Sequence, residues 1–286
     1  MKFLQTVPKD FPGTAAQSHV PATFNATIDD FFWLNWRGLW TLFTKEVRRF
    51  TKIWGQTLIS PLIMTLLFYA VFALGLGKHP MPTGQGSLLT FIVPGLVMMA
   101  VAQNAFMNTS VSLVLSKLQG NIVDILMPPL SPFELTAGYL AGGLARGLLV
   151  GAVSLGVLAL IEPLPVFNVW IALYFAVMGS LMLAAIGLIT GILGNRFDHL
   201  GAVQNLVIMP ATFLSGTFYS ISQLPDKWRI FCQLNPFYYM IDGFRYGLTG
   251  QTDIPLWGGM ALLLCVNLAL FNVAYWLFAQ GAGLKQ

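Results

Sequence analysis

Six apolar blocks, each close to the length of a membrane-crossing helix, determine what this chain can fold into. A helix needs about 20 apolar residues to cross the hydrocarbon layer, whereas a strand of a membrane barrel needs about ten of alternating polarity. Of the 286 residues, 56% are hydrophobic and only 9% are charged. We therefore predict an all-α integral membrane protein with six transmembrane helices. The blocks are residues 57–77, 88–115, 136–161, 169–194, 200–221 and 255–279.

The two ends of the chain differ in composition. Residues 1–30 contain prolines, acids and polar residues but no apolar stretch of signal-peptide length, so we expect a flexible N-terminal tail. Residues 31–286 are expected to form one transmembrane domain. If the N-terminus is cytoplasmic, ten of the 15 Lys and Arg residues lie on the cytoplasmic side, four lie outside and Arg146 lies within a span. This bias predicts that both termini are cytoplasmic.

Two connections are more than simple loops. From Phe31 to Trp54, tryptophans and other apolar residues recur every three or four positions among basic residues, which is typical of an amphipathic helix in the headgroup layer. A plain positively charged flank is the alternative. The segment 222–252 is rich in aromatic residues but also contains Asp242 and Arg245, so we expect short external helices between spans five and six.

The sequence contains no arrangement that indicates an active site. No GxxxxGK[ST] phosphate-binding loop is present, and the histidines at 19, 79 and 199 are too dispersed to suggest a metal or catalytic site. Cys232 and Cys265 lack metal-type spacing, so we expect them to serve packing. The basic residues mostly flank spans, which topology explains without nucleic acid. We expect neither enzymatic activity nor a bound metal or cofactor in this chain.

The third block carries two unusual features. Its glycines at 138, 142, 143, 147 and 151 form small-xxx-small patterns, which favour close helix packing over a flexible conduit wall. Arg146 lies roughly 15 Å into the same block, where an arginine is costly. Gln103 and Asn104 lie at a similar depth in the antiparallel second block and are candidate partners. The alternative is that Arg146 snorkels toward the cytoplasmic interface.

The connection between the second and third blocks reads as a short, rigid helix. Residues 120–127 have apolar side chains on one side and Asn121 and Asp124 on another, and Pro128-Pro129 ends the helix. Ser131, with Glu134 three residues later, forms a predicted capping box that starts the next helix. Such an element can transmit a displacement if a partner docks on it; a turn at the membrane surface is the alternative.

Several of these stretches together resemble the membrane subunit of ABC-2 type ATP-binding-cassette exporters. They are "NIVDILMPPLSPFELTAGYLAGG" from Asn121, "LNPFYYMIDGFRYGLTG" from Leu234, "LISPLIMTLLFYAVFALGLG" from Leu58 and "FIVPGLVMMAVAQNAF" from Phe91. The resemblance implies a bacterial inner-membrane permease that dimerises, most simply as a homodimer, and binds a separate ABC ATPase dimer that uses ATP and Mg²⁺. Family substrates include glycans, lipid-linked molecules and drugs.

The resemblance also assigns roles to residues. The connection between spans two and three would be the coupling helix that contacts the ATPase, and the stretch from Leu234 would be the family's external motif. The coupling residues are Lys117, Gln119, Asn121, Asp124, Leu126, Pro128 and Pro129, and the external motif residues are Asn235, Pro236, Asp242 and Arg245.

Other classes of function fit less well. An ATPase-independent secondary transporter or channel would more naturally show inverted repeats and several acids inside its spans, whereas Glu162 and Asp198 lie at span ends. A membrane-embedded enzyme lacks clustered catalytic groups, and a scaffold without transport stays open. The sequence therefore favours a permease energised by a partner, with membrane lipid as its surroundings.

Overall fold

The structure is a computed structural model that describes residues 35–76, 87–221, 225–253, 255–281 and 283. The predicted tail, residues 1–30, lies outside the described residues. The described chain is folded into helices, which confirms the predicted all-α class. They are α1 (Trp36–Lys52), α2 (Ser60–Leu76), α3 (Leu88–Leu118), α4 (Ile122–Leu126), α5 (Pro132–Ile161), α6 (Val169–Leu193), α7 (Phe197–Val203), α8 (Met209–Phe213), α9 (Asp226–Gln233), α10 (Pro236–Thr249) and α11 (Leu256–Gln280).

Among the described residues, five helical segments are long and apolar enough to cross a membrane. They correspond to the first four predicted blocks and the sixth: Gly55–Gly75, Leu88–Leu118, Pro132–Ile161, Val169–Leu193 and Leu256–Gln280. The first begins with a π-helical turn, Gly55–Ile59, which continues into α2.

The predicted fifth span is shorter and less regular than expected. Its helix begins at Phe197, passes through a π-helical turn (Gln204–Ile208) and ends at Phe213, whereas residues 200–221 were predicted. Seventeen residues at about 1.5 Å each reach about 26 Å, slightly less than the hydrocarbon thickness. Gly216, in the left-handed conformation with φ 68°, redirects the chain after the helix. The six-span count is therefore not confirmed by helix length alone.

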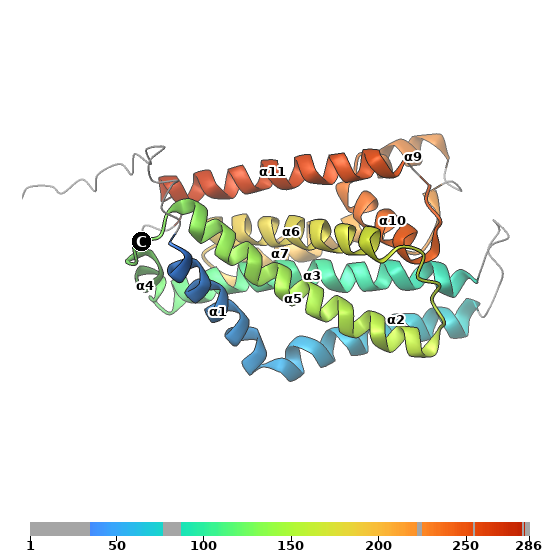
Figure 1. The fold of residues 1–286 in the computed structure, drawn as a ribbon, viewed down its shortest axis with the longest axis horizontal. Coiled ribbons are helices and arrows are strands. Elements are labelled where there is room, and N and C mark those ends of the chain that lie inside the picture. Colours follow the sequence, from blue (N-terminus) through green and yellow to red (C-terminus); the bar gives the residue numbers. More distant parts are fainter. Residues whose placement is uncertain (1–34, 77–86, 222–224, 254, 282, 284–286) are drawn as a thin grey trace, which may run out of the picture.

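Helix α3 is the centre of the bundle (Figure 1). In the most apolar 18-residue stretch of α3, 83% of the residues are buried. The corresponding share is 11% for the segment that contains α2 and 22% for α11. Helices α5 and α6 pack closely on it: the Thr109 hydroxyl donates to the Ala184 carbonyl at 2.8 Å, and Gly143 lies against both residues. The glycines of α5 therefore serve close packing, as predicted from their spacing.

The described ends of the chain lie at one end of the bundle, together with α4 (Figure 1). The backbone N–H of Asn35, which precedes α1, donates to the Glu134 carboxylate in the first turn of α5. Gly283, beyond α11, lies against the carbonyl of Ile192 near the end of α6. Helices α9 and α10 lie at the opposite end (Figure 1). Short helices between the fifth and sixth predicted spans are thus present.

Candidate functional site

Helix α4 is a short, exposed helix between two long, packed ones. Ile122 is buried, whereas Val123, Asp124 and Met127 are exposed. Gly120, with φ 74°, makes the turn out of α3. The other exposed residues predicted for coupling are Gln119, Asn121, Pro128 and Pro129, and Leu126 is the last residue of α4. The residues of α4 and its flanks therefore form a small exposed surface between the end of α3 and the start of α5.

The predicted capping box holds the segment after α4. The Ser131 hydroxyl accepts a hydrogen bond from the Glu134 backbone N–H at 3.3 Å, and the Glu134 carboxylate accepts one from the Ser131 N–H at 2.7 Å. The second carboxylate oxygen of Glu134 accepts the bond from Asn35 already described. Since the Asn35 side chain caps α1 through Gly38 N–H at 2.9 Å, one buried acid connects the starts of α1 and α5.

Lys117 holds the end of α3 against the end of α6. Its side chain is buried, and its ammonium group donates to the carbonyls of Ile192 at 2.5 Å and Gly194 at 3.1 Å and to the Asn195 side chain at 3.4 Å. Because a lysine ammonium has three donors, these contacts satisfy it within the chain. Lys117 therefore fixes the base from which α4 projects and does not itself lie on the exposed surface.

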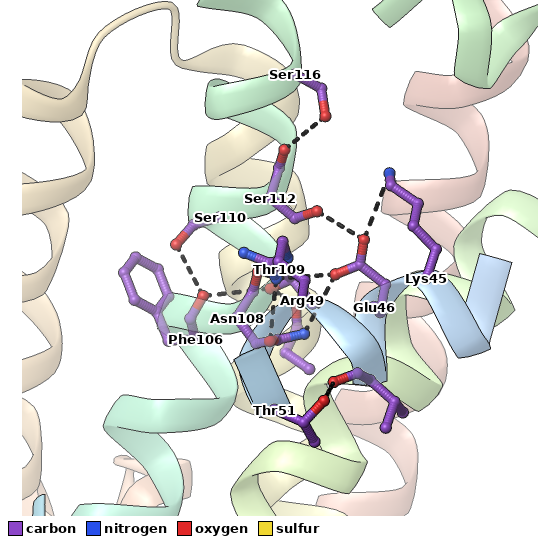
Figure 2. Close-up of polar contacts among 12 residues, drawn as sticks. Lys45, Glu46, Arg49, Thr51, Phe106, Asn108, Thr109, Ser110, Ser112 and Ser116 are labelled. Atoms are coloured by element: carbon purple, nitrogen blue, oxygen red, sulfur yellow. Dashed lines mark hydrogen bonds and ion pairs between the residues drawn. The ribbon is translucent and has the colours of Figure 1, made fainter. Parts of the chain in front are cut away.

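A buried polar network joins α1 to α3 (Figure 2). The Glu46 carboxylate is fully buried; it accepts a hydrogen bond from Ser112 Oγ at 2.7 Å and lies 2.9 Å from the Arg49 guanidinium. Arg49 also donates to the Asn108 carbonyl at 2.7 Å and to its side-chain oxygen at 3.0 Å. Lys45 Nζ lies 3.6 Å from the carboxylate, and burial lowers the pKa of Lys45. We call Glu46, Arg49, Asn108 and Ser112 the inner joint.

Sequence reasoning missed Glu46. The sequence from Phe31 to Trp54 favours a basic, tryptophan-rich surface helix, and Trp36 and Trp40 are indeed exposed. The helical face formed by Leu42, Glu46 and Phe50 is buried instead. The signal was present: the single acid of α1 lies at i+4 from one apolar residue and i−4 from another, on one helical face. Placement of α1 in the headgroup layer stays a prediction.

The predicted contact between the second and third spans is present. The Arg146 guanidinium donates to Asn104 Oδ1 at 3.2 Å, which places Arg146 inside the bundle. Gln103 lies in the same region, although its Nε2 has no hydrogen-bond partner among the described residues. The pairing of Arg146 with Asn104 is thus confirmed, and the contact predicted with Gln103 is not formed.

At the opposite end, Arg245 joins α10 to the start of α3. Its side chain is 1% exposed, and it donates to the carbonyls of Phe91 at 3.2 Å and Gly216 at 2.6 Å. Its guanidinium carbon lies 3.7 Å from the centre of the Phe91 ring. Asp242 lies 3.6 Å from the guanidinium, and burial raises the pKa of its carboxyl group. Thr252 Oγ1 donates to Asp242 at 2.7 Å.

The other two residues of the external motif start α10. The Asn235 side chain accepts from the Phe237 N–H at 3.1 Å, and Pro236 occupies the first helical turn, where its missing N–H costs nothing. The Asn235 amide also donates to the Ala211 carbonyl and to Ser215 Oγ, both at 2.9 Å. The motif is therefore a structural connection between α8, α10 and α3; we call Asp242 and Arg245 the outer joint.

Helix α4, the Glu46 network and the residues of the external motif lie within a region that matches a known family. Residues 37–249, from the first turn of α1 to the last residue of α10, match the family described as ABC-2 type transporter. The chain belongs to the ABC-2 type transporter family. It is 36% identical over 253 residues to the inner membrane transport permease YadH of Escherichia coli K12, with 88% of this chain and 98% of YadH aligned.

Less similar relatives include nodulation protein J from two rhizobia. The chain is 24% identical over 233 residues to nodulation protein J of Rhizobium leguminosarum bv. viciae, covering 76% of this chain and 83% of that protein. It is 23% identical over 246 residues to nodulation protein J of Rhizobium meliloti, covering 83% and 90%. The resemblance inferred from the motifs is confirmed: this is a transmembrane transport permease, a transport protein rather than a catalytic one.

Proposed function

We propose that this chain is the membrane-spanning subunit of an inner-membrane exporter whose energy comes from a separate ABC ATPase. ABC-2 family membership implies association with such an ATPase. The proposed cargo is a glycan, a lipid-linked molecule or a drug-like molecule. The observation that carries the proposal is the exposed helix α4, held between α3 and α5 by buried polar contacts on both sides.

The mechanism follows from how α4 is attached. Lys117 fixes the chain before α4 to the end of α6, and Glu134 fixes the chain after it to the starts of α5 and α1. A displacement of α4 is therefore transmitted to packed helices and is not dissipated in a loop. The inner joint adds a second connection, because Glu46 and Arg49 fix α1 to α3. We infer that ATP binding at the partner moves α3, α5 and α1 as a group.

The proposed assembly contains two copies of this chain, most simply a homodimer, and two ATPase subunits that bind ATP and Mg²⁺. Both termini are proposed to be cytoplasmic, on the side of α4. The segment from Phe197 to Gly216 supports a sixth crossing. Its start follows the residues that Lys117 contacts at one end of α3. At the other end of α3, Arg245 donates hydrogen bonds to the carbonyls of both Gly216 and Phe91.

The decisive test asks whether an ATPase docks on α4. Val123 on α4 and Val166 at the opposite end of the bundle are similarly exposed, at 55% and 57%. We would purify the tagged chain from native membranes, identify any co-purifying ATPase, and measure its affinity and stimulated ATP hydrolysis for Val123→Asp and Val166→Asp. An introduced charge at an interface centre should weaken binding about tenfold or more, so only Val123→Asp should lose binding and stimulation.

Two results would contradict the proposal. If the Val123→Asp chain binds and stimulates the ATPase as the unaltered chain does, α4 is not the docking surface. If no ATPase accompanies the unaltered chain while reconstituted vesicles still transport, an ATPase-independent carrier or channel is the better description. Transport driven by ATP in vesicles that contain both proteins would support the full proposal.

A further inference from the structure

A cavity of about 280 Å³ lies beside Arg146 between four parts of the chain. Its lining comes from the segment that contains α2, from α3, from α5 and from the region of the second π-helical turn. Gln56, Ser60 and Met64 line the cavity and are also exposed, so the cavity reaches the surface beside α2. The volume lies just below the range of about 300–1,000 Å³ that is usual for small-molecule sites, so it can hold only a small group or part of a larger ligand.

Arg146 is the one charged residue in the described lining, which contains no acid. Its guanidinium has five N–H donors, but its hydrogen bond to Asn104 uses only one. Its Nε is buried and without a partner among the described residues, and so is the Nε2 amide of Gln103 in the same lining. Buried donors without acceptors are costly, so their occurrence together in a cavity points to an acceptor that binds there.

The part of the chain that the structure describes places no free carboxylate beside Arg146. Arg146 lies near the middle of α5, about 20 Å from either helix end. Within the five spanning segments the sole acid is Glu134, at the start of α5, where its oxygens are already engaged. Glu46, the buried acid of α1, is occupied by Arg49 and Ser112. The same residues of a second copy have the same acids and therefore supply no free carboxylate at this depth either.

The rest of the lining suits a flexible apolar chain. Four methionines line the cavity, and unbranched thioether side chains adapt to irregular apolar ligands. They come from three separate elements, so the apolar surface surrounds the space beside the polar group. These residues are Met64, Met99, Met107 and Met209.

We propose that this cavity binds an anionic amphiphile, with its phosphate or carboxylate against Arg146 and Gln103 and its apolar chain along the methionines. Arginine suits this role because its planar donors match two oxygens of such a group at once. The membrane lipid and the cargo are both possible sources of this chemistry. Binding to the site requires neither the partner ATPase nor ATP, so the assignment goes beyond the transport function and is tested separately from it.

The first experiment compares two probes that have the same dodecyl chain but headgroups of different net charge. The purified full-length chain is titrated with dodecyl phosphate and with dodecylphosphocholine in a neutral maltoside detergent, without nucleotide, while thermal unfolding is followed. The unaltered chain should bind dodecyl phosphate about tenfold more tightly than dodecylphosphocholine, since only the former has a net negative charge. Equal affinities would overturn the proposal.

Variants then locate the binding site. Arg146→Gln should lower the affinity for dodecyl phosphate about tenfold or more, whereas Arg48→Gln, which removes an exposed cation of α1, should leave it unchanged. Gln103→Leu covers the case in which Arg146→Gln fails to fold. It removes a buried unpaired amide, so the ligand-free chain should be at least as stable as before, yet it should bind dodecyl phosphate less well. Unchanged affinity in Gln103→Leu and in a folded Arg146→Gln would overturn the assignment.

The source of the anion is distinguished in bilayers. Nanodiscs containing a photoreactive phosphatidic acid are illuminated, and the labelled peptides are mapped. Labelling near Met99 and Gln103 that Arg146→Gln abolishes would identify a membrane lipid as the ligand. If dodecyl phosphate binds with the expected dependence on Arg146 and the lipid does not label these peptides, the site selects an anionic molecule other than bulk lipid, which supports the cargo as the source.

Discussion

The inner and outer joints use the same pair of residue types but differ in how deeply the arginine is buried. Each contains an acid and an arginine three positions apart on one helix, and each fixes that helix to α3. In the inner joint both residues contact α3, Glu46 through Ser112 and Arg49 through Asn108, and Arg49 remains 23% exposed. In the outer joint the arginine contacts α3 through Phe91 and is 1% exposed, while Asp242 faces the chain that follows α10.

This difference suggests different mechanical roles. Breaking a fully buried pair leaves a charge that water cannot reach, so the outer joint should behave as a fixed attachment. A partly exposed arginine can be hydrated when its partner moves away, so the inner joint can change at lower cost. We therefore expect the outer joint to determine whether the chain folds, and the inner joint to determine how displacement of α4 reaches α3.

The largest effect is expected from Arg245→Ala. It removes the hydrogen bonds to the carbonyls of Phe91 and Gly216 and the contact with the Phe91 ring, and it leaves Asp242 buried without its cation. We expect the free energy of unfolding to fall by about 3–5 kcal/mol. Denaturant unfolding in detergent micelles measures this loss. A loss below about 1 kcal/mol would remove the distinction between the joints.

A smaller loss of stability is expected from Glu46→Ala. Ser112 and Asn108 lose an acceptor, but Arg49 keeps its hydrogen bond to the Asn108 carbonyl and is partly hydrated. We therefore expect the free energy of unfolding to fall by about 1–3 kcal/mol. ATPase stimulation by the variant should fall more than its affinity for the ATPase, because α4 itself is unchanged. Glu46→Gln, which keeps an acceptor oxygen, is the control and should retain more stimulation. Equal losses of affinity and stimulation would contradict the transmission role.

Sequence spacing predicted a helix start and a contact between two spans. The Ser131–Glu134 capping box follows from a spacing of three and is present. The contact of Arg146 with Asn104 follows from equal depth in antiparallel helices and is also present. The fifth span was less predictable, because apolar composition continues past Phe213 while the left-handed Gly216 turns the backbone. Hydropathy measures apolar content and does not report where a helix ends.

The inner joint could not be predicted from the sequence, because it is formed by tertiary contacts on which composition gives no information. Four basic residues lie near Glu46 in the sequence of α1, so the pattern indicates a cationic helix at a surface. Only the packing of α1 against α5 and α3 shows that its single acid is buried. Lys117 is a similar case: its place at a span end suggests an exposed cytoplasmic charge, yet the end of α6 supplies three oxygens to it.

The smallest expected effect tests whether α5 positions the inner joint. A Cβ at Gly142 would lie 2.6 Å from Cβ of Glu46, whereas a Cβ at Gly156, in the same helix, would meet nothing within 4 Å. Gly142→Ala should therefore push Glu46 away from Ser112 and cost about 1–2 kcal/mol. Gly156→Ala should be neutral or stabilising by up to about 1 kcal/mol, because alanine favours the helix. Paired unfolding and ATPase-stimulation measurements distinguish the two. If Gly142→Ala lowers stability without lowering stimulation, the close contact serves packing alone and the inner joint becomes, like the outer joint, a fixed attachment.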